Sequence, residues 1–252
     1  MKPAKTDPKV SCPIVCGEYM RATGFFFKAN NQTHLITARH NVLPTDSTTF
    51  ETGTFQMHYR TRDFLPIVDI YLRGKTTSTV ERIDLRNQRD ILIDERIDII
   101  GIPVDIDPQQ HGYVSWSHND ITTPTTSSTL DSIGYPGNCF PDGNYDTEMY
   151  SQEITNPYVL SLEEPSHANL PITDQTGLIG IAVYTGPTKT DTMYNGYSGS
   201  PILGDGLLGI HCSNRPATIT NTKANETSKI NTIQYWQADT LNDLVNKQPQ
   251  RV

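Results

Sequence analysis

Short runs of apolar and β-branched residues recur along the chain, separated by turn-forming residues. Residues 25–29 and 34–37 flank Asn30 and Asn31, and this arrangement predicts a β-hairpin with a two-residue turn. Between the runs, helical periodicity is almost absent. The pattern therefore predicts an all-β protein built as a sandwich or barrels. Further strands are predicted at residues 55–59, 67–72, 97–104, 130–134, 158–162, 178–184 and 207–212.

The C-terminus departs from the strand pattern. Leu241, Leu244 and Val245 recur at helical spacing, and Asp239 or Thr240 is available as the N-cap, so we expect a C-terminal helix. A polar stretch over residues 105–129 is typical of a connection between two lobes. We therefore expect one domain made of an N-terminal extension (1–22), a first β lobe (23–115) and a second β lobe with the helix (116–252).

Composition and charge narrow the class of protein. The 252 residues are 35% hydrophobic and carry a net charge of −8, so the chain is too apolar for disorder and lacks the basic surplus that nucleic-acid binding requires. No apolar run is long enough for a membrane span or a signal peptide, which predicts a cytoplasmic protein without a membrane partner. A single C-x-x-x-C pair gives little support for a zinc site, and we expect no metal or cofactor. Cys12 and Cys16 could form a small disulfide, but free thiols are the expectation.

The hexapeptide Gly-Tyr-Ser-Gly-Ser-Pro at residues 196–201 is the first candidate for chemistry. Its glycines permit backbone angles that side chains forbid, so the loop can present Ser198 and converge successive N–H groups on one point. The same six residues also fit an ordinary hairpin turn. A serine hydroxyl is a weak nucleophile and needs a neighbouring base, so the rest of the chain must decide between the two interpretations.

His40 is the candidate base among the seven histidines. It follows a predicted strand, and the small Ala38 and the turn-forming Asn41 suit a histidine presented at a strand end. Such a base needs a carboxylate that fixes its tautomer. Asp98 begins the apolar run 98–104 and is preferred for this role, while Asp90 begins a shorter run and remains the alternative.

In the order His, Asp, Ser, these residues resemble the trypsin-like (chymotrypsin-fold) serine peptidases. The motifs that carry the resemblance are Thr-Ala-Arg-His at 37–40, Asp-Ile-Ile-Gly-Ile at 98–102 and Gly-Tyr-Ser-Gly-Ser-Pro at 196–201. The resemblance implies two six-stranded antiparallel β-barrels followed by a C-terminal α-helix. It also implies His40 as general base and then acid, Asp98 as the orienting carboxylate, and Ser198 as the acylated nucleophile. The N–H groups of Gly196 and Ser198 would form the oxyanion hole, and the substrates would be proteins or peptides.

The motifs are most similar to bacterial glutamyl endopeptidases and viral 3C-like serine proteases. Gly-Tyr-Pro-Gly at 134–137 and Gly-Ile-His at 209–211 carry this likeness. In those families the histidine lines the S1 pocket and contacts a Glu or Gln side chain. The resemblance thus implies an S1 pocket with His211, Thr192 on the opposite wall, and Ser213 or Asn214 nearby. The alternative for His211 is a buried histidine satisfied by backbone groups.

Two departures from the secreted animal enzymes matter. Thr192 stands six residues before Ser198, where an aspartate would favour Lys or Arg at P1, and the paired cysteines around the histidine and serine are missing. Three functions follow: a serine endopeptidase with a Glu or Gln preference at P1, a viral 3C-like processing protease, or a silent trypsin-like domain that binds proteins. Because all three reactive groups are present, we expect an active serine endopeptidase.

Overall fold

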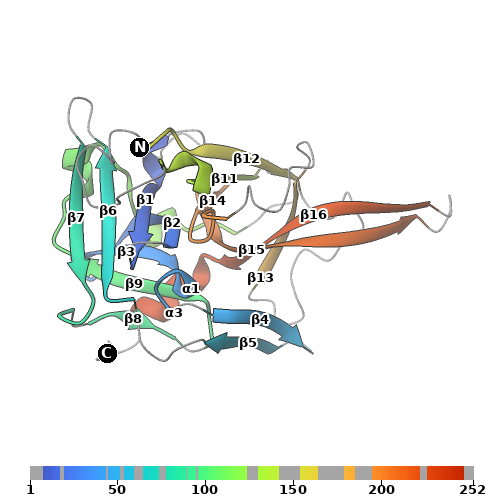
Figure 1. Cartoon of the computed structure of the whole chain (residues 1–252), viewed down its shortest axis with the longest axis horizontal. Helices are drawn as coiled ribbons and strands as arrows, with labels where there is room; N and C mark the ends of the chain where they lie inside the picture. The colour runs from blue at the N-terminus through green and yellow to red at the C-terminus, as the bar shows by residue number, and fades with distance from the viewer. Residues whose placement is uncertain are drawn as a thin grey trace.

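The computed structural model contains two β lobes and a C-terminal helix (Figure 1). It describes residues 8–17, 20–43, 45–51, 54–59, 65–73, 78–88, 90–94, 96–123, 130–141, 154–163, 179–184, 195–221 and 226–246.

The first lobe is an eight-stranded sheet in the order β7-β6-β1-β2-β3-β9-β8, with β10 paired to β2. Asn30 (φ 49°) and Asn31 (φ 63°) form the turn between β2 and β3, because asparagine tolerates the left-handed backbone that a tight hairpin requires. A separate two-stranded sheet joins β4 to β5. The strands are β1 (Cys12–Cys16), β2 (Met20–Ala29), β3 (Gln32–Ala38), β4 (Thr45–Glu51), β5 (Thr54–Tyr59), β6 (Ile67–Arg73), β7 (Ser78–Asp84), β8 (Leu92–Ile93), β9 (Ile99–Val104) and β10 (Ser115–Ser117).

The second lobe is a closed barrel in the order β11-β12-β13-β16-β15-β14. Its last two long strands form a hairpin that extends away from the rest of the molecule (Figure 1). The strands are β11 (Leu130–Gly134), β12 (Tyr158–Glu163), β13 (Ile179–Tyr184), β14 (Pro201–Leu203), β15 (Leu207–Asn221) and β16 (Glu226–Gln237).

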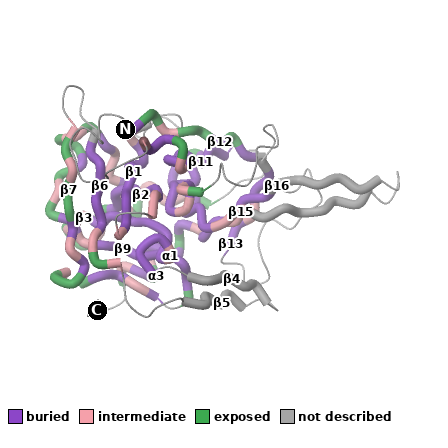
Figure 2. The backbone as a smooth tube through the Cα atoms, viewed as in Figure 1, coloured by how far each residue is buried: buried purple, intermediate pink, exposed green. Residues whose placement is uncertain are grey.

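Short helical turns connect the strands, and one amphipathic helix closes the chain. Helix α3 (Asp239–Asn246) buries Leu241 and Leu244 completely, in a core cluster that also contains Ile97 of the first lobe and Trp236 of the second. The buried positions in Figure 2 accordingly continue from one lobe into the other. The short turns are η1 (Pro8–Val10), α1 (Arg39–Val42), η2 (Pro108–His111), η3 (His118–Asp120) and η4 (Gly137–Cys139).

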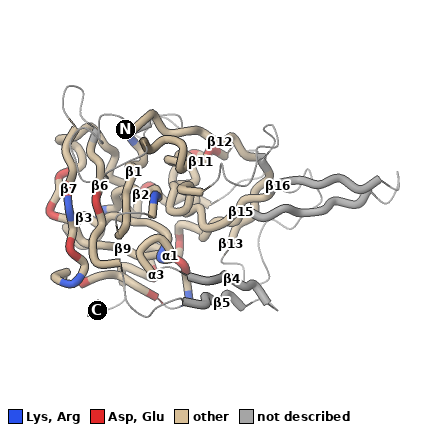
Figure 3. The backbone as a smooth tube through the Cα atoms, in the orientation of Figure 1, with Lys and Arg blue, Asp and Glu red and all other residues tan. Residues whose placement is uncertain are grey.

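Several charged residues lie along β6 and β7, where acids and bases alternate (Figure 3). Arg82 pairs with Asp69 through two hydrogen bonds of 2.7 and 2.9 Å, and Arg86 pairs with Asp84. The described residues of β6 and β7 therefore carry both charges and include no run of basic residues. Within the described part of the chain, no helix has the length and apolar character needed to cross a membrane.

The structure confirms the all-β class, the two lobes and the C-terminal helix, and it adds three corrections of detail. The six-strand count holds for the second barrel, whereas the first lobe has eight strands in one sheet. Strand β1 comes from the segment expected to be an extension and pairs with both β2 and β6. Helix α3 begins at Asp239 itself, so neither Asp239 nor Thr240 precedes it as an N-cap; the Thr240 hydroxyl donates to the Gln237 carbonyl instead. All four cysteines are free and buried, as expected for Cys12 and Cys16.

Candidate active site

Two adjacent strands of the first lobe bring His40 and Asp98 together. Strands β3 and β9 are antiparallel, and Ala38 at the end of β3 pairs with Ile99 at the start of β9. His40 follows β3 in the one-turn helix α1, while Asp98 immediately precedes β9. The register of this one strand pair therefore places the two side chains at the same edge of the sheet.

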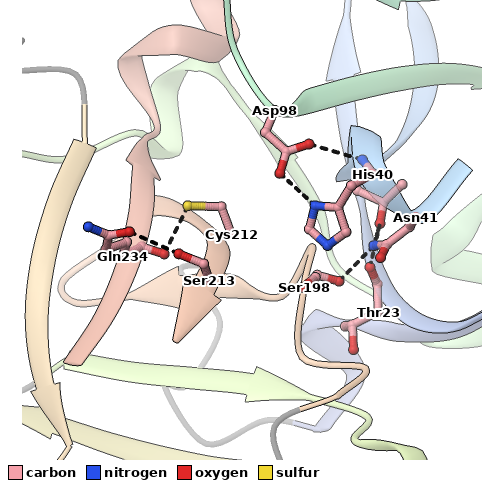
Figure 4. A network of polar contacts seen from close by, with 9 residues as sticks. Thr23, His40, Asn41, Asp98, Ser198, Cys212, Ser213 and Gln234 are labelled. Atoms are coloured by element: carbon pink, nitrogen blue, oxygen red, sulfur yellow. Dashed lines mark hydrogen bonds and ion pairs between the residues drawn. The ribbon is translucent and has the colours of Figure 1, made fainter. Parts of the chain in front are cut away.

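Asp98 holds His40 through two hydrogen bonds (Figure 4). Its Oδ1 accepts from the His40 backbone N–H at 3.0 Å, and its Oδ2 lies 2.6 Å from the His40 Nδ1. The Asp98 side chain is 1% exposed and that of His40 is 21% exposed. When Nδ1–H donates to the carboxylate, the proton-free nitrogen of the neutral imidazole is Nε2. The arrangement therefore fixes the tautomer that a general base requires.

The protonation of His40 reflects two opposing effects. Burial lowers the pKa of His40, but the charge of Asp98 and the hydrogen bond to it raise the pKa, and the net shift is upward from the ordinary 6.5. The alternative carboxylate, Asp90, is exposed at a bend with a φ of 68°. Of the two aspartates considered from the sequence, the structure brings Asp98 to His40.

Ser198 lies on the loop before β14. Gly196 (φ +100°) and Gly199 (φ +91°) both adopt backbone angles that side chains rarely allow. A Cβ at Gly199 would collide with the Thr23 carbonyl and the Thr37 hydroxyl, so glycine is needed there for close approach as well. The loop is tied to β15, because Gly199 N donates to the His211 carbonyl at 2.8 Å and His211 N donates to the Ser200 carbonyl at 2.9 Å.

Figure 4 shows the His40 ring between Asp98 and Ser198. Among the described residues, no hydrogen bond joins His40 to Ser198, as is common before a substrate tightens such contacts. The N–H groups of Gly196 and Ser198 likewise donate to no other described residue. The site thus contains the half-buried Ser198, the His40 imidazole bound to a carboxylate, and two N–H groups of the Ser198 loop that have no acceptor among the described residues.

His211 is buried and neutral. Its Nδ1 lies 3.2 Å from the Ser132 hydroxyl, its Nε2 lies 3.2 Å from the Asn214 Oδ1, and its ring stacks on Tyr197 with centroids 5.9 Å apart. Burial lowers the pKa of His211 to about 3; the hydrogen bond to Asn214 acts in the opposite direction, and the charge of His40 lowers the pKa further. His211 therefore carries no charge near pH 7.

The other predicted pocket residues are placed differently. Asn214 contacts His211, but the Ser213 hydroxyl donates to the Gln234 Oε1 at 3.0 Å, beside the Cys212 thiol (Figure 4). Thr192 lies outside the described residues. The structure thus brings His211 and Asn214 together, while Ser213 is paired with Gln234.

Three buried polar residues, Thr23, Thr37 and Asn41, contact the Ser198 loop or one another in a way that the sequence did not predict. Asn41 was expected to form a turn after the strand, yet it lies inside α1, and its side-chain amide donates to the Ser198 carbonyl at 3.0 Å. Thr23 donates to the Gly196 carbonyl at 2.7 Å. The available signal was a threonine next to the apolar run of each strand, Thr23 in β2 and Thr37 in β3. The strand pattern alone cannot show that these threonines face a loop of the other lobe.

Metal binding has little support in this part of the molecule. Over the described ranges, no group of three or more His, Cys, Asp or Glu side chains lies close enough to hold a metal ion.

The chain resembles known proteins in its three-dimensional structure and not in its sequence. No protein-family model and no curated protein sequence matches the chain. Human heparin binding protein superposes with a TM-score of 0.51 at 10% identity, over 100% of this chain and 98% of that one. The thermostable serine protease AL20, from an extremophilic microorganism, gives a TM-score of 0.49 at 10% identity, over 95% and 96% of the two chains.

The HtrA-type protease AlgW gives a TM-score of 0.48 at 11% identity and is matched over 97% of this chain. The chain spans only 64% of the length of AlgW. The matched structures are trypsin- and chymotrypsin-fold proteins. The chain therefore has the chymotrypsin fold of the trypsin-like serine proteases.

Proposed function

We propose that this protein is a serine endopeptidase that hydrolyses peptide bonds through His40, Asp98 and Ser198. The observation that carries the proposal is the 2.6 Å contact between the buried Asp98 carboxylate and the His40 Nδ1, with Ser198 on the other side of the ring (Figure 4). A buried carboxylate needs a partner of this kind, and the partner it has is a histidine adjacent to a glycine-flanked serine.

In the proposed mechanism, Ser198 Oγ attacks the scissile carbonyl while His40 Nε2 takes its proton. The imidazolium that forms is stabilised by Asp98 and then gives its proton to the leaving amine. The N–H groups of Gly196 and Ser198 stabilise the negative charge that develops on the carbonyl oxygen. Water then attacks the acyl-enzyme, with His40 again acting as the base. The ester bond to Ser198 Oγ breaks, the new carboxyl terminus leaves, and His40 returns the proton to Ser198 Oγ. The substrates are proteins or peptides.

Ser198→Ala tests the proposal directly. We expect kcat to fall by about 10⁴-fold or more without loss of folding, because the nucleophile is removed from a loop that keeps its glycines. Labelling with a fluorophosphonate probe should modify the folded wild-type protein at Ser198 and leave the variant unmodified, as read by peptide mass spectrometry. Folded wild-type protein that remains unlabelled would exclude the peptidase and leave the silent binding domain.

We further propose that the S1 pocket prefers Glu or Gln, with His211 and Asn214 as the residues that select them. The Asn214 Oδ1 accepts from the His211 Nε2–H, so the amide group of Asn214 remains as a donor for a side-chain oxygen of the substrate. Because burial keeps His211 neutral, the pocket supplies hydrogen bonds without a positive charge. Gln at P1 is therefore expected to be cleaved at least as well as Glu.

A P1 peptide library, read as kcat/KM for each residue, tests this preference. We expect Asn214→Ala to lower kcat/KM for Gln and Glu by about tenfold or more and to change cleavage after other residues little, since a site that binds a polar group discriminates through that bond. His211→Ala should act in the same direction. Equal losses for every P1 residue would show that these side chains only support the fold.

A further inference from the structure

The carbonyl groups of residues 195–198, the loop segment that ends at Ser198, each accept a hydrogen bond. The carbonyls of Asn195 and Tyr197 are held within the second lobe, by Gly137 N at 2.7 Å and by Ser200 N at 2.9 Å. Because C=O and the following N–H share one planar unit, these bonds orient the N–H groups of Gly196 and Ser198. The two remaining carbonyls, of Gly196 and Ser198, are held from the first lobe.

The first-lobe anchors form one chain of hydrogen bonds, which we call the clamp and define as Thr23, Thr37 and Asn41. The Thr23 hydroxyl accepts from Tyr135 N at 2.8 Å, so its own hydrogen is directed to the Gly196 carbonyl at 2.7 Å. The Asn41 amide donates to the Thr37 hydroxyl at 2.9 Å, and this hydroxyl donates to the Thr23 carbonyl at 2.7 Å.

The second hydrogen of the Asn41 amide completes the clamp. It is donated to the Ser198 carbonyl at 3.0 Å, and Thr23 N donates to the same carbonyl at 3.3 Å. All three clamp side chains are at most 2% exposed. Buried bonds of this kind are costly to break, because water cannot replace the lost partner.

The position of Asn41 gives the clamp its significance. The base His40 belongs to the first lobe and the nucleophile Ser198 to the second, so their separation depends on how the lobes meet. Asn41 follows His40 in the same helical turn and binds the backbone of Ser198 itself (Figure 4). The Asn41 side chain therefore joins the backbone of the nucleophile to the turn that carries the base, and this link is a hydrogen bond and not a disulfide, since all four cysteines are free.

We propose that Thr23 and Asn41 are positioning residues that hold the Ser198 loop in register with His40. This inference rests on the proposed peptidase function and concerns the same site. It predicts that loss of either anchor lowers the rate of acylation and leaves substrate binding and the protonation of His40 nearly unchanged, since neither side chain contacts Asp98 in the described network.

The variants that test the inference are Thr23→Val and Asn41→Leu, which remove the donors at similar volume. We expect kcat and the rate of fluorophosphonate labelling to fall by about 10- to 100-fold, as for a misplacement of roughly 1 Å, with KM changed by less than about threefold. The pH at which kcat/KM rises should stay at the wild-type value. Thr23→Ser keeps the hydroxyl and should restore activity to within about threefold of the wild type.

Thr240→Val is the matched control, because it also removes a buried threonine hydroxyl that donates to a carbonyl, but in α3. Its activity per folded molecule should equal that of the wild type. Each variant is assayed on protein whose cooperative thermal unfolding has been verified, and rates are expressed per labelled site.

The outcomes separate the two proposals. Wild-type protein that is not labelled overturns the peptidase function. The positioning role is overturned if the wild-type protein is labelled but Thr23→Val and Asn41→Leu are as active as Thr240→Val. If neither clamp variant folds while Thr240→Val does, the clamp serves folding, and the positioning role is also overturned. If a clamp variant lowers kcat and also shifts the pH midpoint of kcat/KM, the substitution acts on His40 and not on the Ser198 loop, and the positioning role is overturned.

Discussion

At the scale of single residues, the site depends on groups whose burial would be unfavourable without a specific partner. Asp98 is almost fully buried and makes two hydrogen bonds to His40, and the clamp residues use every donor that their side chains possess. The sequence indicated His40, Asp98 and Ser198, because their residue types suit acyl transfer and their order along the chain resembles that of the trypsin-like serine peptidases. It did not indicate Thr23 or Asn41, because their partners lie more than a hundred residues away along the chain.

The protonation of His40 leads to a prediction for the pH dependence of activity. Catalysis requires the neutral imidazole, and Asp98 raises the pKa of His40 above 6.5, so kcat/KM should rise with pH through a midpoint above 6.5. Asp98→Asn removes the charge that stabilises the imidazolium and should move this midpoint to lower pH. It should also lower kcat by about 10⁴-fold, the size seen for this change in other Ser-His-Asp enzymes.

A pH profile of kcat/KM for the wild type and Asp98→Asn measures both effects. Ser161→Ala is a control that disturbs a different aspartate contact, with Asp131, and should leave the midpoint unchanged. A wild-type midpoint below 6.5 would contradict the balance of burial and charge described for His40.

At the scale of elements, the apolar runs predicted nine of the sixteen described strands, and the helical spacing predicted α3. The predicted β9 began two residues early, and β15 continues beyond its predicted end to Asn221. Strands β4, β7, β10 and β16 were not predicted, because their polar or mixed sequences become strands through pairing with neighbours. The apolar strands β1, β8 and β14 were also missed; β8 and β14 have only two or three residues, and β1 lies in the segment expected to be an extension. The helix start was predicted at the right place but with the wrong cap.

Helix α3 allows a test of how the lobes are held together. Leu244 is fully buried in the cluster that contains residues of both lobes, so Leu244→Ala should lower the free energy of unfolding by about 2–5 kcal/mol. Urea unfolding measures this, in the Ser198→Ala background so that self-cleavage does not contribute. Asp243→Ala, on the exposed side of the same helix, should change the free energy by less than about 0.5 kcal/mol. Equal effects of the two substitutions would show that α3 does not stabilise the lobes.

At the scale of the whole molecule, the candidate site forms where the sheet of the first lobe contacts the barrel of the second lobe. The β3–β9 register places His40 beside Asp98 within the first lobe, and the loop before β14 presents Ser198 from the second. The clamp and the shared core around α3 join the lobes at this point. A site divided in this way requires contacts between lobes, because neither sheet alone holds both the base and the nucleophile.

The sequence by itself determined the fold class and the order of the reactive residues, and it favoured Asp98 over Asp90, the choice that the contact with His40 then made. These follow from local patterns: alternation of apolar residues, glycines beside a serine, and an acid at the head of an apolar run. Only the tertiary structure decided that Ser213 pairs with Gln234, that His211 is buried and neutral, and that Asn41 binds Ser198. Such contacts join residues distant in the chain, and their geometry is set by strand register and lobe packing, which no local pattern encodes.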